Sequence, residues 1–407
     1  MKQIPGGVTA PKGFRAWGVH CGVKSKKADK KDLALILSDQ ECAAAAVYTM
    51  SRGQASPLYV TMEHPEAGTA WGVAANSGNA NACAPQGEEN AEQMCAAAAA
   101  AIGCAPEAVL VSSTGVIGQP LNIAAIQAGV PALYDALDHS AQGSDAAAHA
   151  IMTTDTVKKE AAVETAIGGK TVRLGGVAKG SGMIHPNMGT MLCFLTTDCA
   201  ISPEMIRAAL LETVAVSFNR ISVDGDTSTN DSCILLANGL AGNKEITEKN
   251  DDYAAFREAL EALCVLLARK MASDGEGAKH LITCTVSGAR DEGQAETVAK
   301  SVISSTLTKA AVFGADANWG RVLCAMGYSG ETFDPERVAV SFASAAGEIA
   351  VCAQGRGLAF DEVKAKEILT EHDVEIRVAM GEGDAQCTCW GCDITYDYIK
   401  INGDYRT

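Results

Sequence analysis

Hydrophobic and polar positions along the chain switch repeatedly between strand-like and helix-like spacing. Short apolar runs rich in β-branched residues predict buried strands at DLALILSD (32–39) and MLCFLTTD (191–198). The runs VETAI (163–167) and TVRLGGV (171–177) predict two further strands, and Gly168-Gly169 between them is a two-residue hairpin signal. We therefore expect an antiparallel hairpin between residues 163 and 177.

Other segments repeat their apolar residues at helical spacing. Four of them predict helices: AEQMCAAAAAAIG (91–103), NIAAIQAGVPALYDAL (122–137), SPEMIRAALLETVAVSF (202–218) and YAAFREALEALCVLLARKMAS (253–273). Ser202 directly before Pro203 is a favourable N-cap followed by a favourable first helical residue. Strands that alternate with helices predict a mixed α/β fold in which sheets pack against helices.

The length of 407 residues suffices for two lobes, each with a core. The polar, Gly-containing stretch NGLAGNKEITEKNDD (238–252) is the best candidate for the segment between them. We therefore expect an N-terminal lobe over residues 1–240 and a C-terminal lobe over residues 241–407. Apolar residues make up 47% of the chain but aromatic residues only 5%, so small side chains should dominate the packing.

The formal net charge of −16 argues against nucleic acid or an anionic membrane surface as the main partner. Small charged metabolites remain open as partners. The sequence contains no run of about 18 apolar residues that could span a membrane. The first residues, MKQIPGGVTAPKGF, lack a hydrophobic signal core, so we expect a cytoplasmic protein.

Fifteen cysteines are scattered through apolar segments such as ITCTV, RVLCAM and IAVCAQ, which is typical of reduced thiols in a core. The spacing of Cys387, Cys389 and Cys392 invites interpretation as a metal site. A tetrahedral site needs a fourth ligand, however, and no Cys or His follows Cys392. Because the alternation through CTCWGCDITYDYI fits a strand with thiols on both faces, we expect no metal.

Phosphate-binding motifs find little support. The segment IGGKT (167–171) has the end of a phosphate-binding loop, but Glu164 stands where that motif requires Gly. A hairpin explains the segment better. Coenzyme A therefore gains no support from a phosphate loop.

The most informative segment is KGSGMIHPNMGTMLCFLTTD (179–198), which places Gly189 and Thr190 at a junction between a loop and a strand. A threonine hydroxyl needs a base to act as a nucleophile. The α-amino group of Thr190, with a pKa of roughly 7.7 to 8.0, would serve once the preceding peptide bond is cut. Gly189 lacks a Cβ and leaves its carbonyl open to attack by the hydroxyl. An ordinary Gly-rich loop before a strand is the alternative interpretation.

Motifs along the whole chain resemble the glutamate N-acetyltransferase/ornithine acetyltransferase family of arginine biosynthesis. They are GVTAPKGFRAWGVHCGVK, NSGNANAC, SSTGVIG, IMTTDT, the 179–198 segment, RISVDGDTSTND, SDGEGAKH, GADANWGR and DYIKINGDYRT. In that family the threonine at the position of Thr190 is both the cleavage site and the nucleophile. The resemblance implies an N-terminal-nucleophile-type fold, with cleavage into an α chain of residues 1–189 and a β chain that begins at Thr190.

The segment SSTGVIG supplies the Thr114 hydroxyl and the Gly115 N–H side by side. Two such donors can stabilise a developing oxyanion, although the residues alone favour an ordinary Ser/Thr/Gly turn. The family uses the matching pair as its oxyanion hole. The resemblance therefore assigns that role to Thr114 and Gly115.

Two charged residues are candidates for recognising an amino-acid substrate. Lys179 would meet a carboxylate or assist the nucleophile, and Glu276 would hold a cation; by default both are ordinary surface charges. The resemblance adds Thr153, Asn402 and the terminal Thr407 as substrate contacts. A site residue at the C-terminus requires the last segment to fold back, which the apolar residues 396, 398, 399 and 401 favour.

The implied reaction moves an acetyl group from N-acetylornithine through Thr190 to glutamate, without a cofactor or metal. Whether acetyl-CoA also donates the acetyl group stays open. The resemblance implies that the fragments remain together and pair into an α2β2 assembly. An N-terminal-nucleophile amidohydrolase or aminopeptidase, with water as the acceptor, is the alternative, and a cysteine-based metal-binding protein is a third class. His185 offers a classical triad little support, since no GxSxG motif occurs.

Overall fold

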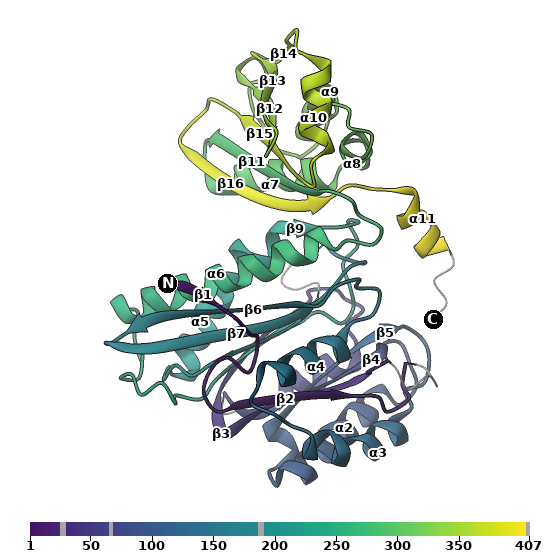
Figure 1. Ribbon diagram of the computed structural model, residues 1–407, viewed down its shortest axis with the longest axis vertical. Helices are drawn as coiled ribbons and strands as arrows, with labels where there is room; N and C mark the ends of the chain where they lie inside the picture. The colour runs from purple at the N-terminus through teal and green to yellow at the C-terminus, as the bar shows by residue number, and fades with distance from the viewer. Residues whose placement is uncertain (25–29, 65–67, 186–190, 404–407) are drawn as a thin grey trace.

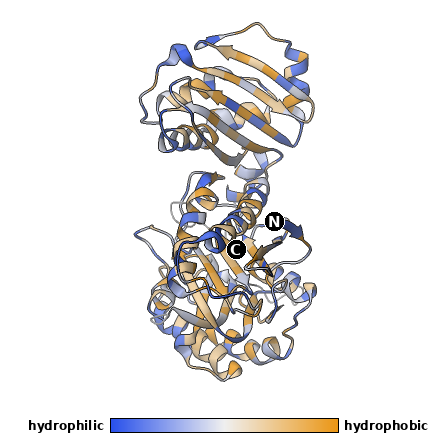
Figure 2. Cartoon of the chain, turned by 90° about the vertical axis from the view of Figure 1, so that its left-hand side faces the viewer, coloured by the Kyte–Doolittle hydropathy of each residue, from blue (hydrophilic) through white to orange (hydrophobic). Residues whose placement is uncertain are grey.

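The computed structural model describes residues 1–24, 30–64, 68–185 and 191–403. Two lobes are stacked, each built on one sheet, with the chain passing from the broad first lobe to the narrow second (Figure 1). The prediction of a mixed α/β architecture is confirmed. Figure 2 shows apolar residues along the strands of the first sheet, and apolar residues that alternate with polar ones along strands of the second.

In the described part of the chain, the first sheet has nine strands in the order β1-β6-β7-β8-β10-β3-β4-β5, with β2 paired to β3. Their bounds are β1 Lys2–Ile4, β2 Phe14–Val19, β3 Leu33–Tyr48, β4 Thr69–Asn79, β5 Val109–Val116, β6 Lys159–Ile167, β7 Lys170–Lys179, β8 Leu192–Thr197 and β10 Ser232–Ala237. The expected hairpin is confirmed: β6 and β7 pair antiparallel, and Gly168 and Gly169 have φ angles of +55° and +74°. Positive φ at both positions is what a type I′ turn requires.

Helices cover both faces of this sheet. They are α1 Ser56–Glu63, α2 Gly87–Ile102, α3 Ile123–Asp135, α4 Ala141–Ile151, α5 Pro203–Val216 and α6 Asp251–Ser273. The four predicted helices correspond to α2, α3, α5 and α6, and Ser202 caps α5 by accepting a hydrogen bond from the N–H of Met205. One core lies between α5, α6 and the strands β6 to β10, and another between α2, α3 and the strands β3 to β5.

The second sheet has seven strands among the described residues, in the order β14-β13-β12-β15-β11-β16-β9. Their bounds are β9 Ile221–Ser222, β11 Leu281–Ala289, β12 Ala339–Ser344, β13 Gly347–Ala353, β14 Arg356–Gly357, β15 Asp373–Ala379 and β16 Ala385–Cys392. The helices that pack on it are α7 Glu292–Ser304, α8 Thr306–Phe313, α9 Trp319–Gly327 and α10 Glu362–Thr370. The last helix, α11 Tyr396–Gly403, returns toward the first lobe (Figure 1).

One expectation differs from what the structure shows, and one helix lies next to the lobe boundary that we predicted at residue 240. The helix α6 follows this boundary, and its buried face shares a core with the strands of the first sheet. The strand-like alternation from Cys387 onward ends at Cys392, and residues 396–403 are helical. No helix among the described residues is long and apolar enough to cross a membrane.

Candidate active site

The end of the edge strand β5 and the end of the inner strand β7 meet at one cavity. The last residue of β7, Lys179, pairs with Leu192 at the start of β8, and Leu192 pairs with Ser232 at the start of β10. Thr114 and Gly115 lie near the end of β5. The sheet topology therefore gathers segments that are more than a hundred residues apart in the sequence.

This cavity, of about 360 Å³, brings together six of the predicted site residues. They are Thr114, Gly115, Thr153, Lys179, Glu276 and Asn402. The other three predicted site residues, Gly189, Thr190 and Thr407, lie outside the described residues. Met191, which follows Thr190, lines a small adjoining cavity of about 20 Å³ together with Thr114 and Lys179.

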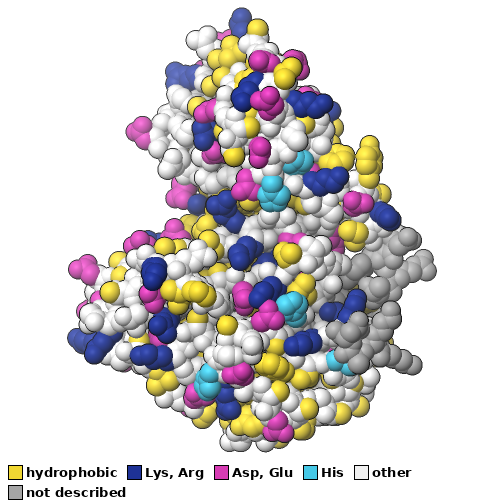
Figure 3. Space-filling view, viewed as in Figure 1, with side chains coloured by type: hydrophobic (Ala, Val, Ile, Leu, Met, Phe, Trp, Pro, Cys, Tyr) yellow, Lys and Arg dark blue, Asp and Glu magenta, His cyan; other side chains and the backbone are white. Residues whose placement is uncertain are grey.

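A larger cavity of about 590 Å³ lies at the waist between the lobes. Lys158, Arg269, Lys270 and His372 line it, and Figure 3 shows Lys and Arg side chains gathered on this face of the waist. It contains none of the six predicted residues described above. The cavity of about 360 Å³ is therefore the candidate active site.

Gly115 occupies a position that no other residue fits. Its φ is +134°, and a Cβ built there would lie 2.3 Å from the carbonyl carbon of Gly78. The register of β4 and β5 shifts beside it, where Asn79 faces both Thr114 and Val116. Such irregularities re-aim side chains and interrupt pairing at the edge of a site.

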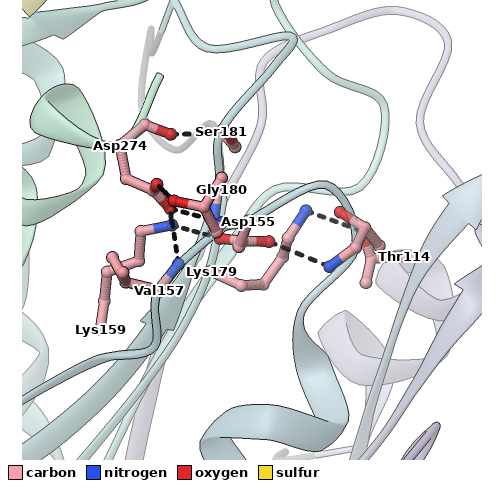
Figure 4. A network of polar contacts seen from close by, with 10 residues as sticks. Thr114, Asp155, Val157, Lys159, Lys179, Gly180, Ser181 and Asp274 are labelled. Carbon is pink, nitrogen blue, oxygen red and sulfur yellow. Dashed lines mark hydrogen bonds and ion pairs between the residues drawn. The ribbon is translucent and has the colours of Figure 1, made fainter. Parts of the chain in front are cut away.

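Lys179 is buried and points toward Thr114, with 3.4 Å between its Nζ and the Thr114 Oγ1 (Figure 4). Burial lowers the pKa of this ammonium group below its usual value because water no longer solvates the charge. The carboxylate of Asp155 opposes that change, and the charge of Lys159 reinforces it. Lys179 is therefore easier to deprotonate than a surface lysine.

Beside Lys179 lies a buried ion-pair network centred on Lys159 (Figure 4). Lys159 Nζ contacts Asp155 Oδ1 and Asp274 Oδ2, each at 2.5 Å, and its side chain is fully buried. Burial alone would raise the pKa of Asp155, but the charges of Lys179 and Lys159 lower it below its usual value. Asp155 is therefore ionised, as a partner of a buried ammonium must be.

The same network connects the three segments that carry the substrate-contact candidates. Asp155 accepts hydrogen bonds from the N–H groups of Thr153 (3.0 Å) and Gly180 (2.8 Å). The carbonyl of Asp274 accepts a hydrogen bond from the Ser181 hydroxyl at 2.6 Å, and the N–H of Glu276 donates to the Ser181 carbonyl at 2.9 Å. One buried ammonium thus holds together the segments of Thr153, Lys179 and Glu276.

The C-terminal helix α11 reaches the cavity. Asn402 Nδ2 donates to Glu276 Oε2 at 2.7 Å, and the Thr395 hydroxyl donates to the Gly277 carbonyl at 2.7 Å. Gly182 allows Glu276 to approach, because a Cβ at this glycine would lie 2.4 Å from the Glu276 Cδ. Glu276 is buried and not an ordinary surface charge.

His185 is placed differently from a triad base. Its Nδ1 lies 3.0 Å from the Ser222 hydroxyl, and burial lowers the pKa of its ring. It is not among the described residues that line the candidate active site. Cys387 and Cys389 lie in the core of the second lobe, whereas Cys392 lies in a core of the first. No group of three potential metal ligands occurs in the described part of the chain.

Sequence reasoning missed the acidic residues Asp155, Asp231 and Asp274, and also Lys159. Each acidic residue lies inside a motif that was quoted as a whole, namely IMTTDT, RISVDGDTSTND and SDGEGAKH. A polar residue within a mostly polar motif gives no sign that its side chain is buried. The only signal of burial in the sequence was the position of these charged residues next to small ones.

Comparisons with known proteins agree along the whole chain. The sequence model of the ArgJ family matches residues 15–407. The arginine biosynthesis bifunctional protein ArgJ of Symbiobacterium thermophilum is 50% identical over 408 residues, which cover 100% of both chains. The protein of the same name from Bacillus subtilis is 46% identical, over 100% of this chain and 98% of its own.

A solved structure is also similar. The crystal structure of the arginine biosynthesis bifunctional protein argJ from Bacillus halodurans matches with a TM-score of 0.50 and 43% sequence identity. The match covers 52% of this chain and 98% of the solved chain. The solved chain is therefore about half as long as this one.

Proposed function

The chain belongs to the ArgJ family and is an enzyme, and on this premise we propose that it transfers an acetyl group from N-acetylornithine to glutamate. The products are ornithine and N-acetylglutamate. The observation that carries the proposal is the meeting of Thr114, Gly115, Lys179 and Glu276 around one cavity. Its volume of about 360 Å³ lies within the range of small-molecule sites.

Thr190 is the proposed nucleophile. Cleavage of the Gly189–Thr190 bond frees its α-amino group, which then accepts the proton of the Thr190 hydroxyl. The hydroxyl oxygen attacks the acetyl carbonyl of N-acetylornithine, and the amine of ornithine leaves. Glutamate's amine then takes the acetyl group from Thr190, which restores the hydroxyl. The described neighbours support this assignment, because Met191 directly follows Thr190 and lines a cavity with Thr114 and Lys179.

Thr114 and Gly115 are the proposed oxyanion hole. The negative oxygen of each tetrahedral intermediate accepts hydrogen bonds from the Thr114 hydroxyl and the Gly115 N–H. Lys179 Nζ, 3.4 Å from the Thr114 hydroxyl, orients that hydroxyl. The requirement for glycine at position 115 supports a backbone role for this residue.

The charges of the cavity suit an amino-acid substrate. We assign the substrate carboxylate to Lys179 and the substrate ammonium to Glu276, which Asn402 holds in place. The N–H of Thr153 donates a hydrogen bond to Asp155, and Thr153 lines the same cavity. Thr407 completes the proposed set of contacts. Acetyl-CoA as a second acetyl donor would load the same Thr190.

Self-cleavage and assembly belong to the same proposal. The solved Bacillus halodurans chain is matched over 98% of its length by 52% of this chain, which supports a protein present as two pieces of similar size. The pieces here would be residues 1–189 and 190–407. We propose that they stay associated and pair into an α2β2 assembly in the cytoplasm.

The experiment is an intact-mass measurement of the wild type beside Thr190→Ala and Thr190→Ser. The wild type and the Ser variant, which keeps a hydroxyl, should separate into two fragments, whereas Thr190→Ala should remain at 42.1 kDa. The cleaved protein is then incubated with N-acetylornithine, with and without glutamate. Ornithine release that needs glutamate supports the transferase. Release at the same rate without glutamate would make the enzyme an amidohydrolase, and an uncut, inactive wild type would contradict the proposal.

A further inference from the structure

Met183 is held in a backbone conformation that residues other than Gly seldom adopt. Its φ is +55°, and of the non-Gly residues with a positive φ in the described part of the chain, it alone lines the candidate active site. Such a conformation costs free energy and persists only where the surrounding structure enforces it. Residues of this kind gather at functional sites, so the placement of Met183 calls for an explanation.

The neighbours of Met183 enforce its conformation. The carboxylate of Asp224 accepts hydrogen bonds from the N–H groups of Met183 (2.6 Å) and Ile184 (2.9 Å). The carbonyl of Ile184 accepts another from the N–H of Val223 at 2.7 Å, and the Ile184 side chain is buried in the core that α5 and α6 share with the first sheet. Met183, the residue before it, is instead 42% exposed and lines the cavity.

Met183 is part of an apolar surface inside a cavity that otherwise has mostly polar walls. The other apolar side chains among the described lining residues are Val116, the last residue of β5, and Ile117. Ile117 is 39% exposed, so it too leaves apolar surface uncovered in the cavity. A ligand with an apolar part would gain free energy by covering these side chains. The cavity therefore suits a ligand that carries methylene groups as well as charges.

The position of Met183 is fixed relative to Glu276. A Cβ at Gly182 would lie 2.4 Å from the Glu276 Cδ, so the carboxyl group of Glu276 packs against the residue directly before Met183. The N–H of Glu276 also donates to the carbonyl of Ser181 at 2.9 Å. A ligand whose cation binds Glu276 therefore brings the atoms next to that cation toward Met183.

We propose that Met183 determines specificity for the length of the substrate's side chain by contacting its methylene groups. This inference rests on the proposed function, which assigns the substrate carboxylate to Lys179 and the substrate ammonium to Glu276. A diamino acid presents these two charges at the ends of an apolar chain. Because the network of Lys159 holds the segments of Lys179 and Glu276 together, the separation of the two charges is set by the protein. Met183 covers the methylene groups next to the ammonium and leaves no room for a longer chain.

Donors of different chain length test the inference. They are ornithine, diaminobutyrate, which is one methylene shorter, and lysine, which is one methylene longer, each acetylated on the α-amino group, with glutamate as the acceptor. One methylene in an apolar site typically changes kcat/KM about 10- to 200-fold, so the wild type should prefer N-acetylornithine by a factor in that range. Met183→Ala keeps the Cβ, and so the same backbone constraint, but removes the rest of the side chain. Its preference for N-acetylornithine over N-acetyllysine should fall at least about tenfold.

A second variant separates the volume of the side chain from its apolar character. Met183→Gln keeps nearly the same length and shape but places a polar amide against the methylene groups. We expect the KM for N-acetylornithine to rise at least about threefold with little change in kcat, and the preference over N-acetyllysine to persist. Met62→Ala is the matched control, because Met62 is 40% exposed on α1 and is not among the residues that line the cavity. Its substitution should leave the kinetics of all three donors unchanged.

The possible outcomes separate the inference from the proposed function. An unchanged preference in Met183→Ala, including N-acetyllysine that stays without detectable turnover, would overturn the inference. So would an unchanged KM in Met183→Gln, or an equal effect of Met62→Ala. If Met183→Ala is inactive with every donor, the KM of Met183→Gln decides, since that variant keeps the shape of the side chain. A wild type that forms no ornithine from N-acetylornithine would instead show that the proposed function itself is wrong.

Discussion

Asn402 donates a hydrogen bond from its Nδ2 to the Oε2 of Glu276 at 2.7 Å, although 126 positions separate the two residues. The contact brings the C-terminal helix α11 to the wall of the candidate active site. Glu276 is buried, and the bond fixes the direction in which its carboxylate points. The C-terminal helix α11 is therefore part of the site's construction.

Replacement of Asn402 by Ala should weaken substrate binding. Loss of a hydrogen bond to a charged group typically costs more than loss of a neutral one, but Asn402 is exposed and the effect is reduced accordingly. We expect the KM for N-acetylornithine to rise about fivefold to tenfold with little change in kcat. Steady-state kinetics measures this. Lys400→Ala, on the same helix, is the control, and an equal rise in KM there would mean that α11 as a whole had shifted.

Lys159→Met should destabilise the protein, because it leaves Asp155 and Asp274 buried without their cation. Breaking a buried ion pair costs about 3–5 kcal/mol. Urea unfolding in the uncut Thr190→Ala background provides the measurement. Adding Asp274→Asn to Lys159→Met should recover part of the loss. If the two substitutions are simply additive, the network does not act as a unit.

The free energy of unfolding should also depend on pH, because the pKa of Lys179 is lowered in the folded state. The unfolded state keeps the usual pKa near 10.5, so between the folded and unfolded values the unfolded chain binds more protons. The free energy of unfolding therefore gains a contribution as pH rises through this window, and that contribution is absent below the folded pKa. In the Thr190→Ala background, adding Lys179→Met should remove this gain. Denaturation at a series of pH values compares the two, and parallel curves would contradict the assignment.

Gly115→Ala should abolish most acetyl transfer. The added Cβ would meet the Gly78 carbonyl carbon at 2.3 Å, which forces β4 and β5 apart at the proposed oxyanion hole. Loss of one oxyanion donor typically lowers kcat by 10²- to 10³-fold. Gly118→Ala is a matched control, since Gly118 also has a positive φ, +80°, but open space around it. Equal losses in both variants would show that backbone strain, and not the close approach, is responsible.

Much of the fold follows from local sequence patterns, and the reasons are physical. The hairpin at Gly168-Gly169 and the cap at Ser202 are decided by residues within a few positions of each other. The α11 segment was harder, because Tyr396, Tyr398, Ile399 and Ile401 fit strand alternation, yet the chain there is a short, mostly exposed helix anchored through Thr395. The packing of α6 depends on contacts with distant strands, which its own periodicity cannot reveal.

Some residues of the candidate site could likewise be predicted from local sequence patterns, and others could not. Lys179 and Glu276 could be named as candidates because each is a charged residue within a Gly-containing segment, whereas the Thr114-Gly115 pair was named through the family resemblance. Lys159, by contrast, reads as one of two adjacent lysines at the start of a strand, and only the fold shows that it is fully buried while Lys158 is partly exposed. Asp231 is equally hidden within TSTND. Burial is a property of the sheet order, and no local pattern contains it.

The sheet order has a consequence for a chain cut before Thr190. The strands β8 and β10 would belong to the later fragment, while their outer neighbours β7 and β3 would belong to the earlier one. The two polypeptides would thus be interleaved within a single sheet, joined by the β7–β8 ladder on one side and the β10–β3 ladder on the other. Separation of the two fragments would require the hydrogen bonds of both ladders to break and the shared core to be exposed to water. The two fragments of such a cleaved molecule would therefore stay associated on dilution, because the hydrogen bonds of both ladders would join them.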